Sequence, residues 1–236
     1  MDLNLKCKRA LVTGSSIGIG YAIAKGLAIE GAKVIAIAAD LGRAEGAAEL
    51  VGKAGHVDIL VNNVGSFEPA AFTDDADWLR YFEVNVMSGV RLSRALLPGM
   101  VSRTWGRIVF ISSESGIQTP KEMVHYGVTK TAQLALSRAI AESVAGTSVT
   151  SNSVLPGPTP SEGVVDFVEK LAADQQTDTT TFEREFVKTM RPSSLIGRFA
   201  ETEEVANLVV FLCGAGSSAI TGASLRVDSG VVRSII

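Results

Sequence analysis

A short apolar segment runs straight into a glycine-rich turn near the start of this 236-residue chain. Residues 9–12 are β-like, and the turn that follows carries Gly14, Gly18 and Gly20. Residues 19–30 then repeat apolar side chains at helical spacing. A strand that leaves a glycine turn as a helix is the first part of a βαβ unit, and such units build parallel sheets. The turn therefore restricts the chain to the α/β fold class.

The same alternation of strand-like and helix-like segments continues to the end of the chain. Strands are predicted at 33–38, 57–61, 107–111, 149–155 and 223–227. Helices are predicted at 42–53, 75–103, 125–145 and 203–212, the second of them with a break near Gly99. With no internal repeat and no linker, residues 1–236 are expected to form a single domain. The expected fold is a Rossmann-type doubly wound parallel sheet with helices on both faces.

Composition and charge exclude several classes of protein. Hydrophobic residues make up 46% of the chain, and the formal net charge of −3 gives no general attraction to nucleic acid or to anionic membranes. No apolar run has the length of a membrane span, and residues 1–6 lack the apolar core of a signal peptide. Cys7 and Cys213 cannot build a disulfide framework and fit a reducing cytoplasm, the expected location. His56 and His125 have no Cys or His at ligand spacing, so we expect no metal site.

The three glycines of the turn fit the cradle of a dinucleotide pyrophosphate. Gly14 would permit the tight turn, Gly18 would let the backbone approach the phosphates, and Gly20 would let the helix pack on the sheet. The N-terminus of helix 19–30 would add free N–H groups and a partial positive charge. The spacing is G-x-x-x-G-x-G rather than G-x-G-x-x-G, and a glycine turn without a ligand is the alternative. The strand–turn–helix context favours the cradle.

A second pattern, Tyr126-x-x-x-Lys130 with Ser113 upstream, predicts a proton-transfer site. Positions i and i+4 share a helix face, so the phenol and the ammonium would point into one crevice. A free tyrosine has a pKa of about 10, and a nearby cation would lower it. Tyr126 would then exchange a proton with a carbonyl or alcohol oxygen held by Ser113. Because a Tyr-x-x-x-Lys pair is common on surface helices, the other motifs of the chain decide between a site and a solvated helix face.

Those motifs span nearly the whole chain in a fixed order. They are Thr13-Gly14-x-x-x-Gly18-Ile19-Gly20, Asn62-Asn63-Val64-Gly65, Asn85, Ser113, Tyr126-x-x-x-Lys130, Pro156-Gly157, Gly197-Arg198, Thr221-Gly222 and Val227-Asp228. In this pattern the chain resembles the short-chain dehydrogenase/reductase family. The resemblance implies hydride transfer between NAD or NADP and a ketone or secondary alcohol. It also implies a homotetramer that pairs the long helices of its subunits.

The family's functional positions transfer to this sequence residue by residue. The resemblance implies a catalytic tetrad of Asn85, Ser113, Tyr126 and Lys130. It implies cofactor contacts at Gly14, Ser16, Ile17, Gly18, Ile19, Gly20, Asp40, Leu41, Asn62, Val64, Gly65, Tyr126, Lys130, Pro156, Gly157 and Thr159. By the same resemblance, Asp40 would contact the adenine, residues 62–65 would lie under the adenosine half, and residues 156–159 would lie beside the nicotinamide.

One departure from the family lies between the glycine turn and Asn62. The family usually has two more strand–helix units there, whereas this sequence shows one. Lys33 and Val34 resemble the start of the second strand, and residues 36–41 resemble the end of the third. A unit of about 25–30 residues is missing. Because a sheet position cannot be skipped without leaving its neighbours unpaired, we predict that the printed sequence omits a segment near 34–36.

Two outcomes separate the possibilities for that region. A chain break near 34–36 would support the omitted segment. An unbroken backbone in six ordered strands would contradict it, and Asp40 would then lie near the adenosine ribose instead.

The same departure leaves the choice of cofactor open. An acidic residue after the second strand favours NAD, and an arginine there favours NADP, but this position falls in the shortened region. Ile17 stands where many NADP-dependent members of the family carry a basic residue, which favours NAD. Arg43 is a candidate phosphate partner or an ordinary solvated helix residue.

Residues 160–195 resemble the family's substrate lid. Apolar residues at helical spacing predict two amphipathic helices, one around 164–171 and one around 182–190. These apolar faces suggest a partly hydrophobic substrate. A helical insertion that serves only packing is the alternative.

The sequence as a whole predicts an NAD(P)-dependent enzyme that interconverts a ketone and a secondary alcohol, with Tyr126 as acid and base. Within the family, the chain is most similar to 3-oxoacyl-acyl-carrier-protein reductases. A sugar, polyol or steroid dehydrogenase is the alternative within the same class. A catalytically silent dinucleotide-binding regulator is the alternative from another class. The expected partner is a small carbonyl or alcohol substrate, with no nucleic acid and no membrane.

Overall fold

Six parallel strands form the centre of the structure, a computed structural model in which residues 2–68, 72–160 and 178–235 are described. The strands are β1 (Arg9–Val12), β2 (Lys33–Ile35), β3 (Ile59–Asn62), β4 (Gly106–Ile111), β5 (Val149–Pro156) and β6 (Ser224–Val227). They lie in the order β2-β1-β3-β4-β5-β6, and every neighbouring pair is parallel. The strand order reverses beside β1, and open α/β sheets bind ligands at such a switch point.

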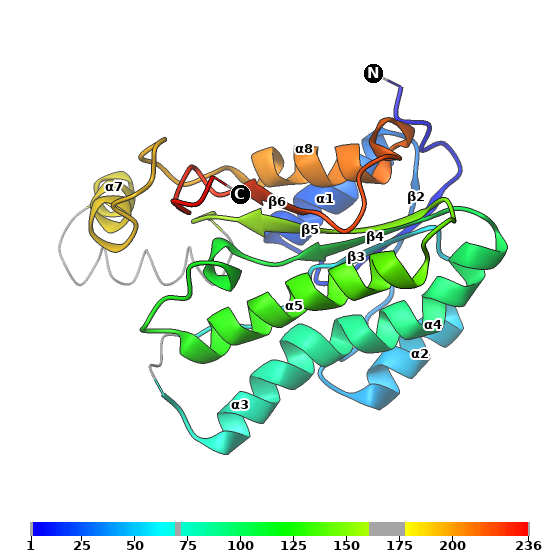
Figure 1. The fold of residues 1–236 in the computed structure, drawn as a ribbon, viewed down its shortest axis with the longest axis horizontal. Helices are drawn as coiled ribbons and strands as arrows, with labels where there is room; N and C mark the ends of the chain where they lie inside the picture. Colours follow the sequence, from blue (N-terminus) through cyan, green and yellow to red (C-terminus); the bar gives the residue numbers. More distant parts are fainter. Residues whose placement is uncertain (1, 69–71, 161–177, 236) are drawn as a thin grey trace.

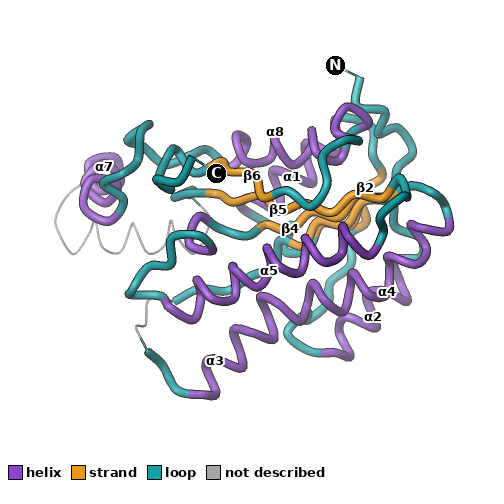
Figure 2. Tube along the Cα trace, in the orientation of Figure 1, coloured by secondary structure: helices purple, strands orange, loops and turns teal. Residues whose placement is uncertain are grey.

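Helices cover both faces of this sheet (Figures 1 and 2). On one face lie α1 (Gly18–Ile29) and α8 (Thr202–Cys213), and on the other lie α2 (Ala44–Ala54), α4 (Ser88–Ser102) and α5 (Val124–Ser143). The helix α3 (Asp75–Phe82) leads through a π-helical turn, η1 (Glu83–Met87), into α4. The helix α7 (Thr179–Met190) stands beyond the carboxyl ends of β4 and β5 (Figure 1). The predicted doubly wound α/β fold is therefore confirmed.

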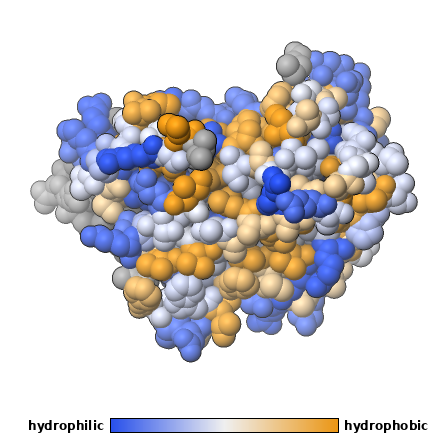
Figure 3. All heavy atoms as spheres, in the orientation of Figure 1, coloured by the Kyte–Doolittle hydropathy of each residue, from blue (hydrophilic) through white to orange (hydrophobic). Residues whose placement is uncertain are grey.

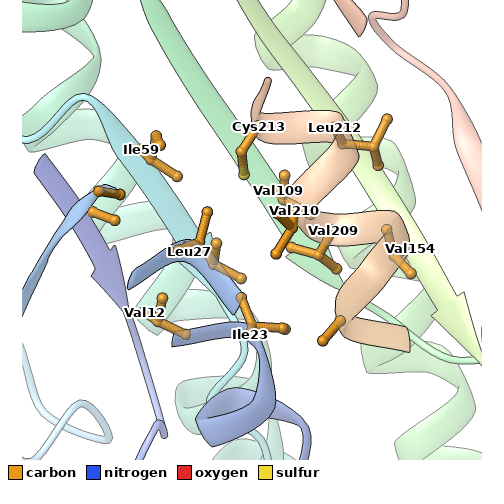
Figure 4. Packing of buried hydrophobic residues seen from close by; sticks show 14 of the residues in the cluster. Val12, Ile23, Leu27, Ile59, Val109, Val154, Val209, Val210, Leu212 and Cys213 are labelled. Carbon is orange, nitrogen blue, oxygen red and sulfur yellow. The ribbon is translucent and has the colours of Figure 1, made fainter. Parts of the chain in front are cut away.

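Each face of the sheet packs on its own hydrophobic core. Val109 of β4 points toward Ile23 of α1 and Val209 of α8 (Figure 4). Its neighbour Phe110 points to the other face, where it packs with Leu92 of α4. Successive side chains of a strand alternate between faces, so the apolar residues of β4 serve both cores. Burial of a large apolar side chain contributes about 1.5–3 kcal/mol, and the two cores hold the strand ends in fixed positions.

The predicted break in the long helix was placed wrongly. Pro98 and Gly99 lie inside α4, whereas the α-helical pattern is interrupted at η1. A π-helical turn adds a residue to the helical repeat, and such turns are frequent at functional sites. Asn85 lies in this turn. The interruption therefore occurs at a candidate site residue rather than at the glycine that suggested it.

The region of the expected omission forms a continuous edge of the sheet. β2 pairs with β1 from Lys33 to Ile35, and the backbone runs without a break into residues 36–41. No strand among the described residues lies beyond β2. An edge strand such as β2 can lack an outer neighbour without leaving an inner strand unpaired. The expected chain break is not observed: the backbone is unbroken and six strands are ordered, the outcome given above as the one that contradicts an omitted segment.

Two features are absent from the residues that the structure describes. None of their helices is both long enough and apolar enough to cross a lipid bilayer. No three of their His, Cys, Asp or Glu side chains are grouped so as to hold a metal ion. Of the two amphipathic helices expected in 160–195, the second corresponds to α7, and the first lies outside the described residues.

Candidate active site

The glycine turn after β1 has the backbone geometry that a phosphate cradle needs. Gly14 and Gly18 have φ angles of +60° and +58°, in the left-handed region that favours glycine. A Cβ on Gly20 would lie 2.2 Å from the carbonyl oxygen of Gly14, so a side chain has no room there. Ile17, the N-cap of α1, provides no side-chain hydrogen bond to the first turn of the helix. These features leave a narrow turn and a helix N-terminus suited to an anion.

Two polar side chains hold this turn against the end of β3. The Thr13 hydroxyl accepts hydrogen bonds from the backbone N–H groups of Asn63 and Val64, both at 2.9 Å. The Asn63 amide donates to the carbonyl oxygens of Thr13 and Gly14 at 2.9 and 3.0 Å. Thr13 was not among the predicted site residues, and Asn63 was predicted only as part of residues 62–65, although both belong to the motifs that carried the resemblance. Their role as a clamp depends on contacts between segments far apart in the sequence.

Asn85 is buried at the centre of a hydrogen-bond network. Its side-chain oxygen accepts from the Ser66 N–H at 2.7 Å, and its amide donates to the Ser66 carbonyl and to the Thr129 hydroxyl, both at 3.0 Å. The Gln133 side chain donates to the backbone carbonyl of Asn85 at 2.6 Å. Thr129 and Gln133, both on α5, were not predicted from the sequence. The network joins the π-helical turn, the loop after β3 and the helix that carries Tyr126.

Tyr126 and Lys130 lie side by side on α5, as their spacing predicted. The Lys130 ammonium is 5.5 Å from the centroid of the Tyr126 ring. It donates a hydrogen bond to the Ile111 carbonyl at 2.9 Å and is only 4% exposed. Ser113, which follows β4, lies close enough for its side chain to lower the pKa of the Tyr126 phenol. Residues from the end of β4 and from α5 therefore meet at one point, and Asn85 reaches α5 through Thr129.

Burial determines the protonation of this pair. It raises the pKa of Tyr126 to about 12, although the Ser113 side chain opposes the shift. It also lowers the pKa of Lys130 to about 8. The spacing predicted that the ammonium would lower the pKa of the phenol, and the net shift is in the opposite direction. Because Lys130 loses its proton before Tyr126 does, little of its positive charge is present in the pH range where the phenol ionises.

The remaining predicted residues line the carboxyl edge of the sheet with different exposures. Asn62 is buried and its amide reaches the Ser93 hydroxyl at 3.5 Å. A Cβ on Gly65 would lie 3.4 Å from both the Asn85 side-chain oxygen and the Lys130 ammonium. Among the other predicted residues, Leu41, Pro156 and Thr159 are buried, and Ile19, Val64 and Gly157 are half-buried. Ser16 and Ile17 are exposed. The structure brings Gly65, Asn85 and Lys130 together most closely.

Asp40 has no contact with the proton-transfer residues in the described structure. Its carboxylate accepts from the Gly42 N–H at 3.0 Å and lies 3.6 Å from the Arg43 guanidinium, and both charged side chains are exposed. Gly42 itself lies near Val84 of η1. Asp40 therefore sits at the outer end of the carboxyl edge, after β2.

Comparison with known proteins gives matches over most of the chain. The family described as enoyl-(acyl carrier protein) reductase matches residues 37–232. An uncharacterized oxidoreductase of Bacillus subtilis, YvaG, is 46% identical, with all of both chains covered. The 3-oxoacyl-[acyl-carrier-protein] reductase FabG of Aquifex aeolicus is 32% identical over 98% of this chain and 100% of its own. The crystal structure of L-sorbose reductase from Gluconobacter frateurii, complexed with NADPH and L-sorbose, superposes with a TM-score of 0.94 at 30% identity, covering 100% of both chains.

The alignment lengths bear on the shortened region after the glycine turn. The match to YvaG extends over 263 positions, and this chain has 236 residues, so at least 27 positions have no residue here. The number of unfilled positions agrees with the unit of about 25–30 residues expected to be missing. The family match begins at Ile37, two residues after the end of β2 at Ile35.

Proposed function

We propose that this chain, which belongs to the short-chain dehydrogenase/reductase family, reduces a ketone to a secondary alcohol with NADH or NADPH. It would also catalyse the reverse oxidation. The members of this family are NAD(P)-dependent oxidoreductases. The observation that carries the proposal for this chain is the meeting of Ser113, Tyr126 and Lys130 at the carboxyl edge of the sheet, the edge at which the glycine turn also follows its strand. Residues that act on a proton and residues that suit a pyrophosphate thus share one edge of the sheet.

The residues of the cradle fit a dinucleotide. The Gly14–Gly20 turn has no space for a Cβ at Gly20, and α1 begins without a side-chain cap. Both features suit a pyrophosphate on the backbone N–H groups of a helix N-terminus. Lys130 would bind the hydroxyl groups of the nicotinamide ribose. When bound, NAD(P)H supplies the hydride, which the protein's own side chains do not provide.

The proposed proton transfer uses three side chains of this chain. In the reducing direction, Ser113 hydrogen-bonds the carbonyl oxygen of the substrate, and Tyr126 donates its phenolic proton to that oxygen. The Lys130 side chain is held by its hydrogen bond to the Ile111 carbonyl. Its amine would thereby stay beside the phenol, where it would donate to the nicotinamide ribose. Asn85 would act as a positioning residue, because its hydrogen bonds fix the loop at Ser66 against α5.

A panel assay with both cofactors tests the proposed function. We expect hydride transfer from NADH or NADPH to a ketone among a 3-oxoacyl thioester, L-sorbose and a ketosteroid. The thioester and the sugar are included because relatives of similar identity act on each of these chemistries. Tight cofactor binding without any turnover over the panel would instead favour the catalytically silent regulator.

Little discrimination between the two cofactors is expected. Residues 36–39, which follow β2, are Ala-Ile-Ala-Ala, and none of them offers a carboxylate for a ribose 2′-hydroxyl or a guanidinium for a 2′-phosphate. The first charged groups beyond them, Asp40 and Arg43, form an exposed ion pair with each other. A large preference for NADH over NADPH, or the reverse, measured as a ratio of kcat/KM, would contradict this expectation.

The pH dependence should differ between the two directions of the reaction. Because the pKa of Tyr126 is raised to about 12, the phenol carries its proton at neutral pH. Reduction, which needs the protonated phenol, should therefore proceed well at neutral pH. Oxidation, which needs the phenolate as a base, should accelerate steadily as the pH rises into the alkaline range. Initial rates in both directions across pH check this, and an oxidation rate that is flat above neutral pH would contradict it.

We also propose a homotetramer, a cytoplasmic location and a substrate lid over residues 160–195. The helix faces expected to pair across subunits carry exposed apolar side chains, among them Leu79, Phe82 and Val128. Figure 3 shows apolar atoms between hydrophilic ones on the face that carries α5. A monomer in analytical ultracentrifugation would contradict the tetramer.

For the omitted segment, an intact mass of 24.8 kDa for the protein from its natural source would contradict an omission.

A further inference from the structure

A buried ion pair lies beside the proton-transfer site and was not predicted from the sequence. The Arg191 guanidinium Nε is 2.8 Å from the Glu114 carboxylate, and only 12% and 5% of their side chains are exposed. Glu114 directly follows Ser113 and begins the short 3₁₀ turn Glu114–Gly116. Arg191 directly follows α7. The pair thus connects a residue adjacent to Ser113 with the end of α7.

Each partner is fixed by further contacts. The Glu114 carboxylate also accepts a hydrogen bond from the Ser115 hydroxyl at 3.2 Å, and the Ser115 backbone N–H donates to the Ser113 hydroxyl oxygen at 3.2 Å. On the other side, the Arg191 carbonyl accepts from the Ser194 N–H, and the next residue, Leu195, donates to the Ser229 carbonyl at 2.8 Å. The Ser113 hydroxyl and the chain after α7 are therefore held by one connected set of contacts.

We propose that the Glu114–Arg191 pair is a positioning element of the proton-transfer site, which orients Ser113 and acts on Tyr126 through its charges. The proposal rests on the function proposed above. A buried ion pair is weak evidence for stability, because desolvation of both charges offsets much of their attraction. Retention of two charges next to Ser113 is more readily explained by a role at the site than by folding alone.

The charges of the pair have opposite effects on the phenol. Glu114 raises the pKa of Tyr126 and Arg191 lowers it, both less than burial does. Other charged groups lie near the pair or near the phenol. Asp228, after β6, raises the pKa of Glu114, and Glu122, before α5, lies 3.7 Å from the Arg191 guanidinium. Lys130 lies beside the ring of Tyr126. Burial raises the pKa of Glu114, and the charge of Arg191 opposes that shift. Glu114 acts on Tyr126 as a negative charge.

Glu114→Gln tests the charge of the pair with little change of shape. The amide oxygen still accepts from Arg191, and the amide NH2 takes the place of the oxygen that accepted from Ser115, so the Ser115 hydroxyl must turn to accept instead. The negative charge is lost. The pKa of Tyr126 should therefore fall by about 0.5–1 unit, and the alkaline rise of the oxidation rate should move to lower pH by the same amount. Glu114→Asp keeps the charge and should restore most of the wild-type profile. Glu122→Gln removes a carboxylate that also faces Arg191 and should leave the profile unchanged.

Direct titration of the phenol separates this inference from the proposed function. The chain has three tyrosines, so the ultraviolet titration of each protein minus that of its Tyr126→Phe counterpart reports Tyr126 alone. A lower midpoint in Glu114→Gln, with the Glu122→Gln midpoint unchanged, supports the inference even where no substrate reacts. Equal midpoints in wild type and Glu114→Gln overturn it, whether or not the wild-type enzyme transfers hydride.

Discussion

Replacing Tyr126 with phenylalanine is expected to reduce turnover by at least about 10²–10⁴-fold, the usual contribution of a positioned general acid or base. The phenol carries a proton to donate and lies close enough to Ser113 for that side chain to affect its pKa. Phenylalanine keeps the ring that packs at 6.0 Å against Phe67 and lies 5.5 Å from Lys130. Cofactor affinity and thermal stability should therefore change little. The measurement is kcat for the ketone that the wild type reduces, together with cofactor binding by fluorescence.

The control for this variant is Tyr21→Phe. Tyr21 is 53% exposed on α1, and its backbone rather than its hydroxyl makes the contact with Ile17. It should retain wild-type turnover. If Tyr126→Phe retained more than about a tenth of the wild-type kcat, the phenol would not be the principal acid and base, and the roles assigned to the site would be wrong.

Replacing Gly20 with alanine is the second change with a large expected effect. The new Cβ would lie 2.2 Å from the Gly14 carbonyl oxygen and 2.5 Å from the Asn63 amide. The first of these is a backbone atom, so the turn itself must shift, and the shift would disturb both the phosphate cradle and its clamp. We expect cofactor affinity to fall by at least about tenfold, corresponding to about 1.4 kcal/mol, with a lower melting temperature. Isothermal titration with NADH and NADPH and a thermal melt measure the two effects.

Gly52→Ala is the matched control for the cradle. Gly52 lies inside α2, and a Cβ there would meet no heavy atom within 4 Å. Alanine has a higher helix propensity than glycine, by about 0.8–1.0 kcal/mol, so this variant should be as stable as the wild type or more stable, with unchanged cofactor affinity. Equal cofactor binding by Gly20→Ala and Gly52→Ala would contradict the cradle.

The sequence predicted most elements of the fold because local patterns were strong. β1 was predicted with its observed bounds, and α1, α5, β5 and α8 were predicted to within two residues. Strand–helix alternation with buried apolar faces leaves few arrangements other than a doubly wound sheet. The break at η1 was missed because a π-helical turn has no strong local signal, whereas Gly99 has an obvious one.

The predicted site residues could be found where their chemistry appears in a short motif. Tyr126 and Lys130 share a helix face by their spacing, so their adjacency followed from the sequence. The contacts of Asn63 with the glycine turn and of Thr129 with Asn85 depend on tertiary packing, and the sequence alone did not indicate them. Arg191 lies 77 residues from Glu114 in the chain. No local pattern connects two such residues, and only the folded structure identifies them as a pair.

The direction of the Tyr126 pKa shift was also out of reach of the sequence. Spacing shows that a cation lies near the phenol, but the balance between charge and desolvation depends on burial. Lys130 is buried so deeply that its own pKa falls to about 8, which weakens the effect that the sequence argument invoked. The Tyr126 phenol therefore carries its proton at neutral pH, the form that the proposed reduction needs.

Deuterium transfer from the cofactor tests the central claim most directly. Wild-type enzyme and Tyr126→Phe would each be incubated with NADH or NADPH deuterated at C4, together with a 3-oxoacyl thioester or L-sorbose, and the alcohol product would be analysed by mass spectrometry. The account predicts that the wild type places deuterium on the former carbonyl carbon of a substrate and that Tyr126→Phe forms almost none of this product. Absence of deuterated alcohol with folded, cofactor-binding wild-type enzyme, or equal yields from the two proteins, would contradict it.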